Sequence, residues 1–284
     1  MSCTTINKFA LFGYPVAHSL SPIIHRAFAQ QYNFNIAYSC LAVKELELND
    51  CLKHFIAAGG RGVNITAPLK ELAYKMASNL SKRALTARSV NTLTICDGII
   101  SGDNTDGIGF IRDITQRHAI PISNRRILIL GAGGATRGIL ADILALGPCR
   151  ITIANRDLSK VAKIVKDFSA NEIFSSAYSE LKNKTFDLIV NGTTANADQL
   201  TKLLPAQFSF QDCCAYDLNY LENVGSFSSL ARAKGASQIL SGLGMLVEQA
   251  AESFKIWHGV EPVTDPVCMQ LQQNTVQISA IYGV

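Results

Sequence analysis

Residues 126–137 read Arg-Ile-Leu-Ile-Leu-Gly-Ala-Gly-Gly-Ala-Thr-Arg, an apolar run that meets a cluster of glycines and continues as a helical pattern. This order predicts a strand, a tight turn and a helix. Gly131, Gly133 and Gly134 have no Cβ, so the backbone can bend sharply and approach a ligand closely. The free amides that open the helix, together with the positive end of its dipole, would bind a pyrophosphate. The stretch therefore favours dinucleotide binding, with an ordinary strand-to-helix turn as the alternative, because Thr136 occupies the third position of the Gly-x-Gly-x-x-Gly fingerprint.

The bulk composition limits the classes of protein that the chain can represent. Its 284 residues exceed the usual ~100–200 residues per domain, which favours two domains. With 48% hydrophobic and 17% charged residues, the chain is expected to be globular rather than disordered. The net charge of +4 is modest and the basic residues are scattered, so no nucleic-acid partner is expected.

The cysteines, histidines and apolar runs exclude further classes. The eight cysteines include no Cys-x-x-Cys pair, and the five histidines include no metal-binding pair, so no metal site is expected. Such cysteines are typical of buried thiols in a reducing compartment. No apolar run approaches the ~18 residues of a membrane span, and the N-terminus lacks a signal segment, so we expect a cytoplasmic protein without a membrane partner.

Strand and helix patterns alternate along the whole chain. Between Lys8 and Ile100 they predict a first α/β domain, built as a parallel sheet with crossover helices, and a helix is expected to begin at Pro68. From Arg126 to Leu240 they predict a Rossmann-like, doubly wound domain. A helical pattern from Leu243 to Trp257 has one apolar face and should pack back onto the first domain. We therefore expect two α/β domains with a cleft between them.

The end of the second strand after the glycine turn indicates which dinucleotide is bound. Asn155-Arg156 stands roughly 20 residues past the glycines, where an NAD-binding protein normally places Asp or Glu against the ribose 2′-hydroxyl. A guanidinium suits a 2′-phosphate instead, so NADP is favoured over NAD, and Lys160 is a further candidate for the phosphate site. The alternative is an arginine that merely faces solvent.

Two segments of the first domain carry candidate acid–base groups. In Asn64-Ile-Thr66-Ala-Pro-Leu-Lys70, polar side chains alternate at a strand end and a lysine follows in the first turn of a helix. The positive end of a helix dipole disfavours an ammonium ion, which suits a lysine that exchanges a proton. Asp106 closes Gly102-Asp-Asn-Thr-Asp106 and would orient such a lysine near a substrate hydroxyl. The alternatives are a solvated surface lysine and a helix cap.

Pro22 opens a predicted helix, and Ser19 and Ser21 lie at its start. Their hydroxyls could bind a carboxylate ligand there. Ser21 could equally be an ordinary helix cap.

Together these segments resemble one family, the shikimate dehydrogenases, and they occur in the family's order across nearly the whole chain. The segments are Ser19-Leu-Ser-Pro22, Asn64 to Lys70, Val90-Asn-Thr92, Gly102 to Gly107, Gly131 to Ala135 with Arg137, Asn155-Arg156, Tyr216-Asp-Leu-Asn-Tyr220 and Gly242 to Ala250. The resemblance implies reversible reduction of 3-dehydroshikimate to shikimate with NADPH, in aromatic amino-acid biosynthesis. It also implies a substrate-binding and catalytic domain at 1–105, completed by C-terminal helices within 242–284, and an NADP-binding domain at 106–241.

The resemblance also implies roles for individual residues. Lys70 and Asp106 would form the catalytic pair, and Ser19 and Ser21 would hold the substrate carboxylate. The other substrate contacts would come from Asn64, Thr66, Asn91, Tyr220 and Gln249. The cofactor contacts would come from Gly131, Ala132, Gly133, Gly134, Ala135, Asn155, Arg156, Lys160, Leu218 and Gly242.

Two departures from the family pattern fall in the cofactor site. The chain has Asn191-Gly-Thr-Thr194 where Asn-Ala-Thr-Ser is common, and Asp157 follows the arginine in place of Thr or Ser. Two alternatives to the implied activity stay open. One is a quinate/shikimate dehydrogenase that accepts NAD, and the other is a non-catalytic dinucleotide or metabolite sensor on the same fold. The expected assembly is a monomer or a homodimer.

Overall fold

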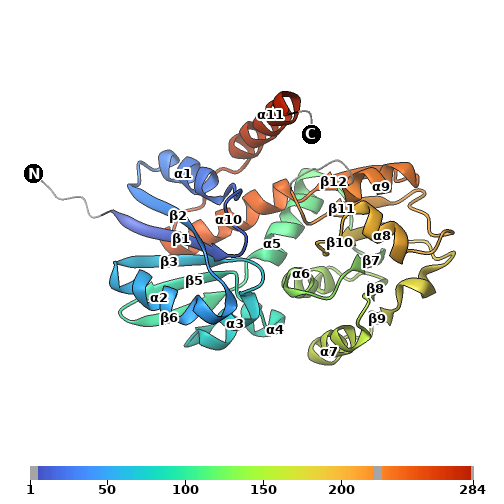
Figure 1. The fold of residues 1–284 in the computed structure, drawn as a ribbon, viewed down its shortest axis with the longest axis horizontal. Helices are drawn as coiled ribbons and strands as arrows, with labels where there is room; N and C mark the ends of the chain where they lie inside the picture. The colour runs from blue at the N-terminus through green and yellow to red at the C-terminus, as the bar shows by residue number, and fades with distance from the viewer. Residues whose placement is uncertain (1–5, 221–225, 283–284) are drawn as a thin grey trace, which may run out of the picture. The chain divides into compact units, whose positions relative to one another are not determined.

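The computed structural model describes residues 6–220 and 226–282, with side chains up to residue 273. The chain divides into two compact units, each with its own six-stranded sheet (Figure 1). The first unit runs to Gly109 and takes in Leu246–Leu271. The second comprises Phe110–Met245 with the chain from Gln272 onward.

The first sheet is mixed rather than parallel. Its strands are β1 (Asn7–Gly13), β2 (Ile36–Ala42), β3 (Gly60–Ile65), β4 (Asn79–Leu80), β5 (Thr92–Cys96) and β6 (Ile99–Asp103), in the order β2-β1-β3-β5-β6-β4. β1 pairs in parallel with β2 and β3, but β5 is antiparallel to both β3 and β6. The prediction of a parallel sheet is wrong here because Asp97 and Gly98, with φ of 49° and 77°, close a two-residue hairpin. A loop of this length joins antiparallel neighbours and is too short for a crossover.

Helices cover both faces of the first sheet. They are α1 (Ser21–Gln31), η1 (Glu45–Glu47), α2 (Leu48–Ala57), α3 (Lys70–Met76), α4 (Lys82–Ala87) and α10 (Leu243–His258). In Figure 1, α1 and α10 lie on one side of the sheet, and α2, α3 and α4 lie on the other. Phe12, Val63 and Leu93 belong to the buried cluster that also contains residues of α2, α3 and α4. α3 begins at Lys70, two residues later than predicted, because Pro68 belongs to the turn in which the Leu69 amide donates to the Thr66 carbonyl.

Helix α10 supplies the apolar cover for the opposite face. The Trp257 ring stacks on Phe9 with 4.7 Å between ring centroids, and its Nε1 donates to the Leu93 carbonyl at 3.1 Å. Phe254 packs edge-on against Phe28 of α1 at 5.7 Å. The prediction that this helix packs onto the first domain is confirmed.

The second sheet is entirely parallel. Its strands are β7 (Arg126–Leu130), β8 (Arg150–Ala154), β9 (Ile173–Ser176), β10 (Leu188–Asn191), β11 (Cys214–Asp217) and β12 (Gln238–Ser241). Their order, β12-β11-β10-β7-β8-β9, places the first strand of the unit inside the sheet, with β10, β11 and β12 wound outward on one side and β8 and β9 on the other. This is the doubly wound order of dinucleotide-binding domains, as predicted. β9 was not predicted: it is a four-residue strand in which only Ile173 and Ser176 are buried.

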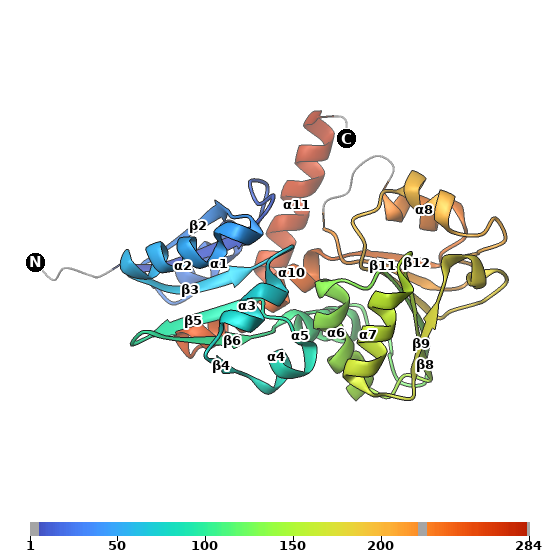
Figure 2. The same cartoon turned by 60° about the horizontal axis from the view of Figure 1, so that its bottom comes forward.

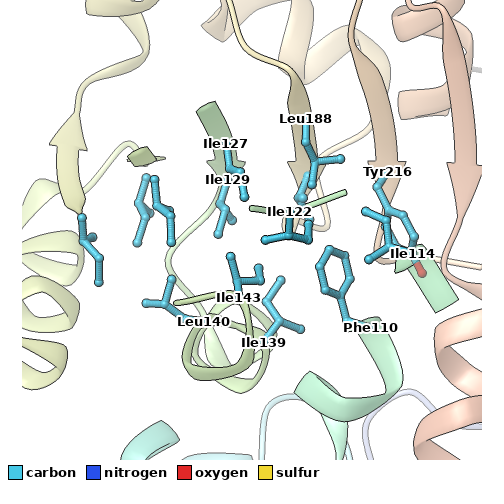
Figure 3. Close-up of a cluster of buried hydrophobic side chains, with 14 of the residues drawn as sticks. Phe110, Ile114, Ile122, Ile127, Ile129, Ile139, Leu140, Ile143, Leu188 and Tyr216 are labelled. Atoms are coloured by element: carbon cyan, nitrogen blue, oxygen red, sulfur yellow. The ribbon is translucent and has the colours of Figure 1, made fainter. Parts of the chain in front are cut away.

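Side chains of this second sheet alternate between two cores, as the twofold period of a strand requires. The remaining helices are α5 (Asp106–Ile111), η2 (Arg112–Arg117), α6 (Gly134–Ala145), α7 (Leu158–Phe168), η3 (Tyr178–Leu181), α8 (Ala197–Leu203), α9 (Phe227–Ala233) and α11 (Asp265–Tyr282). Ile127 and Ile129 point toward Ile139 and Ile143 of α6 (Figure 3). Leu128 belongs to the other core, beneath α8 and α9. Figure 2 shows α6 and α7 on one side of the sheet and α8 on the other.

Within the described residues, no helix combines the length and apolarity needed to cross a membrane.

One buried imidazole links stability to pH. His25 of α1 stacks on Tyr38 of β2, with ring centroids 4.4 Å apart and an interplanar angle of 11°, and it also lies near Trp257. Burial first and the charge of His258 second lower the pKa of His25, against an opposing hydrogen bond with Asn64, to about 3. The unfolded chain therefore binds a proton near pH 6.5 that the folded protein does not bind until about pH 3.

Replacing this imidazole is expected to weaken the pH dependence of stability. Between pH 6.5 and about 3 the free energy of unfolding should fall by about 1.4 kcal/mol per pH unit from this group alone. His25→Phe keeps an aromatic ring but cannot be protonated, so its urea-unfolding midpoint should fall less between pH 7 and 5 than that of the wild type. His54→Phe, at an exposed position of α2, is the control. Equal pH slopes for His25→Phe and wild type would contradict the assignment.

Candidate active site and dinucleotide site

The first unit brings Lys70 and Asp106 into direct contact. Lys70 is the first residue of α3, and Asp106 is the first residue of α5. Lys70 Nζ donates to Asp106 Oδ2 at 2.6 Å, and the two side chains are only 15% and 6% exposed. The reading of Lys70 as a solvated surface lysine is therefore wrong. An ammonium beside a sheltered carboxylate is held in one position and keeps two further N–H groups for a ligand.

Asn91 fixes the other side of the Asp106 carboxylate. Its Nδ2 donates to Asp106 Oδ1 and to Thr105 Oγ1, both at 2.9 Å, and its Oδ1 accepts from the Thr105 amide at 2.9 Å. The same Nδ2 lies 3.2 Å from Oε1 of Gln249. Asn91 and Gln249 thus belong to one hydrogen-bonded network with the Lys70–Asp106 pair. The network orients the carboxylate before any ligand binds.

Asn64 joins the same network from β3. Its Nδ2 lies within 3.1–3.3 Å of the Asn91 carbonyl, Thr92 Oγ1 and Ser253 Oγ, and its Oδ1 accepts from the Tyr38 hydroxyl at 2.7 Å. Ser253 Oγ also lies 2.7 Å from Thr92 Oγ1. Tyr38 and Ser253 were not predicted, because a tyrosine in a strand and a serine in an apolar helix carry no motif.

Ser19 and Ser21 lie together where α1 begins. Ser19 Oγ is 3.2 Å from Ser21 Oγ, and it accepts from the Ser21 amide at 3.2 Å. The N-cap is Leu20, so the alternative of Ser21 as the helix cap is wrong. Thr66 follows β3, and Gly13 makes room for it, since a Cβ at Gly13 would lie 2.2 Å from Thr66 Cγ2. The two hydroxyls therefore lie next to each other at the start of α1.

The glycine turn of the second unit has the geometry that a pyrophosphate requires. Gly131 has φ of +100°, and a Cβ there would lie 2.8 Å from Thr193 Cγ2. α6 starts at Gly134 with no side-chain cap, and a Cβ at Gly133 would meet nothing within 4 Å. The first amides of this helix therefore open onto space that a phosphate can enter, so Gly131 to Ala135 fit the group.

Thr136 explains why the third glycine of the fingerprint is dispensable. Its side chain is fully buried, and its Oγ1 donates to the Gly131 carbonyl at 3.0 Å, which ties the turn to the helix. The space for that hydroxyl comes from Gly192, where a Cβ would lie 2.9 Å from Thr136 Oγ1. Gly192, which stands where the family commonly has Ala in the loop after β10, therefore provides the space that the Thr136 hydroxyl occupies.

The chemistry after β8 fits a 2′-phosphate. Arg156 and Lys160 are exposed, and Arg156 forms no salt bridge with any described residue. Asp157 caps α7, because its Oδ1 accepts from the Ser159 amide at 3.0 Å and from Ser159 Oγ at 2.6 Å. These bonds lower the pKa of the Asp157 carboxyl and hold it at the helix start. Asn155 Nδ2 donates to the Asp157 carbonyl at 2.9 Å, which fixes the turn that presents the arginine.

Leu218 and Gly242 lie side by side where β11 and β12 end. A Cβ at Gly242 would lie 2.4 Å from the Leu218 carbonyl oxygen, so only glycine fits there. Asp217 was not among the predicted site residues. Its Oδ1 accepts from Asn191 Nδ2 and Asn219 Nδ2, both at 3.0 Å, and so joins the loops after β10 and β11. Tyr220 is half-buried in this unit.

The fold and the two sites together define a class. The second unit, with its doubly wound parallel sheet and open glycine turn, and the first unit, with its sheltered lysine–aspartate pair, are the parts of a dinucleotide-dependent oxidoreductase. Among the residues that the structure describes, no three His, Cys, Asp or Glu side chains group as a metal site would require.

Family models assign the chain more narrowly. A shikimate dehydrogenase substrate binding domain matches residues 11–93, a shikimate/quinate 5-dehydrogenase model matches residues 113–211, and a shikimate 5′-dehydrogenase C-terminal domain matches residues 242–271. The chain is 41% identical over 268 residues to a shikimate dehydrogenase (NADP(+)) of Chromobacterium violaceum, covering 94% of this chain and 98% of the relative. The chain belongs to the shikimate dehydrogenase family.

Solved structures agree with this assignment. An Ael1 enzyme from Pseudomonas putida is 40% identical with a TM-score of 0.83, covering 93% of this chain and 98% of that one. A shikimate 5-dehydrogenase from Thermus thermophilus, crystallised with NADP(H) and shikimate, is 30% identical with a TM-score of 0.82 and covers 94% and 99%.

Proposed function

We propose that this chain catalyses the reversible NADPH-dependent reduction of 3-dehydroshikimate to shikimate, in the pathway to aromatic amino acids. The observation that carries the proposal is the sheltered Lys70–Asp106 contact of 2.6 Å. A proton-transfer pair is needed for hydroxyl–ketone chemistry and has no use in a passive dinucleotide sensor. Family membership supports the choice of substrate, and NADP is the cofactor in the names of the curated relatives.

In this mechanism Lys70 exchanges the proton of the reacting hydroxyl. Asp106 holds the lysine through one carboxylate oxygen, and Asn91 holds the other oxygen at 2.9 Å, so the pair is oriented before substrate binds. Bound NADP supplies the hydride chemistry. The protein contributes position and electrostatics.

The proposed function also assigns the remaining contacts to the substrate. Ser19 and Ser21 bind the substrate carboxylate. Asn64, Thr66, Asn91, Tyr220 and Gln249 contact its hydroxyls or ring.

The cofactor contacts come from the second unit. Gly131, Ala132, Gly133, Gly134 and Ala135 bind the pyrophosphate, Asn155, Arg156 and Lys160 the adenosine phosphate, and Leu218 and Gly242 border the nicotinamide. We assign the substrate and catalytic domain to residues 1–105 with 242–284, and the NADP domain to 106–241. We further propose that the enzyme works in the cytoplasm as a monomer or homodimer on small-molecule substrates.

Initial-rate assays test the proposal directly. The purified chain should form NADPH from shikimate and NADP, and kcat/KM should be higher for shikimate than for quinate and higher for NADP than for NAD. Higher kcat/KM for quinate with NAD would instead support the quinate enzyme that the shikimate/quinate family model also covers. If no shikimate-dependent NADPH formed at any pH tested, the proposed enzymatic activity would be refuted, and a non-catalytic dinucleotide or metabolite sensor would be favoured.

A further inference from the structure

Ser253 is a fully buried serine of α10 whose hydroxyl faces the first sheet. The polar atoms around this hydroxyl come from several elements of the first unit: Asn64 Nδ2 of β3 at 3.1 Å, Thr92 Oγ1 of β5 at 2.7 Å, Thr105 Oγ1 at 3.3 Å and the Gln249 carbonyl of α10 at 3.1 Å. A serine inside a helix can satisfy its hydroxyl with the carbonyl one turn back alone. Ser253 has this bond and, in addition, joins the helix to two strands of the sheet.

The contact with Asn64 bears on how the Asn64 amide is oriented. The Asn91 carbonyl, which can only accept, lies 3.2 Å from Asn64 Nδ2, so the nitrogen and not the oxygen is on that side. Nδ2 carries two hydrogens, and Ser253 Oγ is the nearest of its acceptors, with Thr92 Oγ1 at 3.3 Å. Ser253 therefore accepts one of the two hydrogens and fixes the rotation of the amide.

The same serine sets the position of Gln249 relative to the sheet. Residues four apart in a helix lie on one face, so Gln249 and Ser253 project from α10 in the same direction. Gln249 Oε1 lies 3.2 Å from Asn91 Nδ2, and Asn91 Oδ1 accepts from Thr92 Oγ1 at 2.9 Å. One turn along the helix, the short Ser253–Thr92 bond ties α10 to the same part of β5. Gln249 is thereby held at a fixed distance from the side chains of the sheet.

We propose that Ser253 is a positioning residue for substrate binding, which holds Asn64 of β3 and Gln249 of α10 in a fixed relation to each other. The inference rests on the proposed function, in which both residues contact the hydroxyls or ring of the substrate. A hydroxyl that orients two ligand-binding groups before the ligand arrives lowers the ordering cost of binding. Within the part of the chain that the structure describes, Ser253 has no hydrogen bond to Lys70 or Asp106, so its loss should act on KM rather than on kcat.

Ser253→Ala tests the inference, because it removes only the hydroxyl, and alanine is the more favourable residue in a helix. We expect KM for shikimate to rise about three- to tenfold, the effect of losing one hydrogen bond. KM for NADP should not change, and kcat should stay within about twofold, since the Thr105 amide still holds Asn91 against Asp106. Ser89→Ala is the matched control. Ser89 is also fully buried in the first unit, but its hydroxyl has no hydrogen-bond partner among the described residues, so this variant should keep the wild-type constants.

A double-mutant cycle separates positioning from a general structural role. Ser253→Ala should raise KM for shikimate less in an Asn64→Ala background than in the wild type, because one of the two groups that Ser253 orients is already gone. An equal rise in both backgrounds would overturn the inference. So would a matching rise in KM for NADP, or a fall in kcat with KM for shikimate unchanged.

The same assays distinguish failure of this inference from failure of the proposed function. If the wild type oxidises shikimate and Ser253→Ala behaves as Ser89→Ala does, the inference fails while the proposed function stands. A wild type inactive on shikimate removes both.

Discussion

Lys70→Ala is expected to lower kcat for shikimate oxidation by about 10²- to 10⁴-fold, the usual contribution of a general acid–base group. KM should change little, because the proton transfer that Lys70 performs stabilises the transition state more than bound substrate. Steady-state kinetics with both substrates varied would measure the effect. Lys75→Ala, at an exposed position of the same helix α3, is the control and should keep full turnover. An unchanged kcat in Lys70→Ala would remove this lysine from the mechanism.

The contact between Lys70 and Asp106 leads to a second prediction, which concerns the Asp106 variant and the double variant. Because the two side chains meet at 2.6 Å and act as one unit, Asp106→Asn should also depress kcat. The double variant should then lose little more than the worse of the two single variants. Losses that multiply would show that the two residues contribute independently, which contradicts a lysine held and oriented by Asp106.

Arg156→Ala is expected to raise KM for NADP by about ten- to a hundredfold, since a charge-assisted hydrogen bond contributes roughly 1.5–3 kcal/mol. KM for NAD should stay nearly constant, because NAD has no 2′-phosphate for the guanidinium to bind. The ratio of kcat/KM for the two cofactors measures the change. Lys163→Ala, at an exposed position farther along α7, should leave that ratio as it is in the wild type.

The neighbouring carboxylate does not weaken this expectation. Asp157 is held at the start of α7 by two bonds to Ser159, so it serves as a helix cap. Arg156 is left to face solvent and an approaching phosphate. Equal use of NAD and NADP by the wild type would nevertheless refute the role assigned to Arg156.

The two units differ in how far their topology could be predicted from the sequence. In the second unit, each strand is followed by a connection long enough for a crossover, so the alternation of patterns predicted the parallel sheet correctly. In the first unit, the same alternation misled because Asp97-Gly98 reverses the chain in two residues and makes β6 antiparallel to β5, which is itself antiparallel to β3. The turn was visible in the sequence, but its effect on strand direction was not drawn from it.

The residues of the site also differ in how far they could be predicted from the sequence. Lys70 and Asp106 were predicted as a pair, because each stands at a recognisable motif. Tyr38 and Ser253 were not predicted, because nothing in their local sequence separates a tyrosine or serine that bonds to a ligand-binding group from one that only packs. Their importance depends on Asn64, which lies 26 residues from Tyr38 and 189 from Ser253.

The sequence by itself determined the glycine turn after β7, the helix that follows it and the polar residues that stand at strand ends, because each depends on backbone freedom or periodicity within about ten residues. Only the tertiary structure decided that Thr136 replaces the third glycine by bonding to Gly131, and that Asn91 holds the carboxylate of Asp106. The physical reason is the same in both cases. A hydrogen bond of about 3 Å requires a fixed separation and angle between two groups, and distant parts of a chain acquire these only when the sheet and its helices are packed.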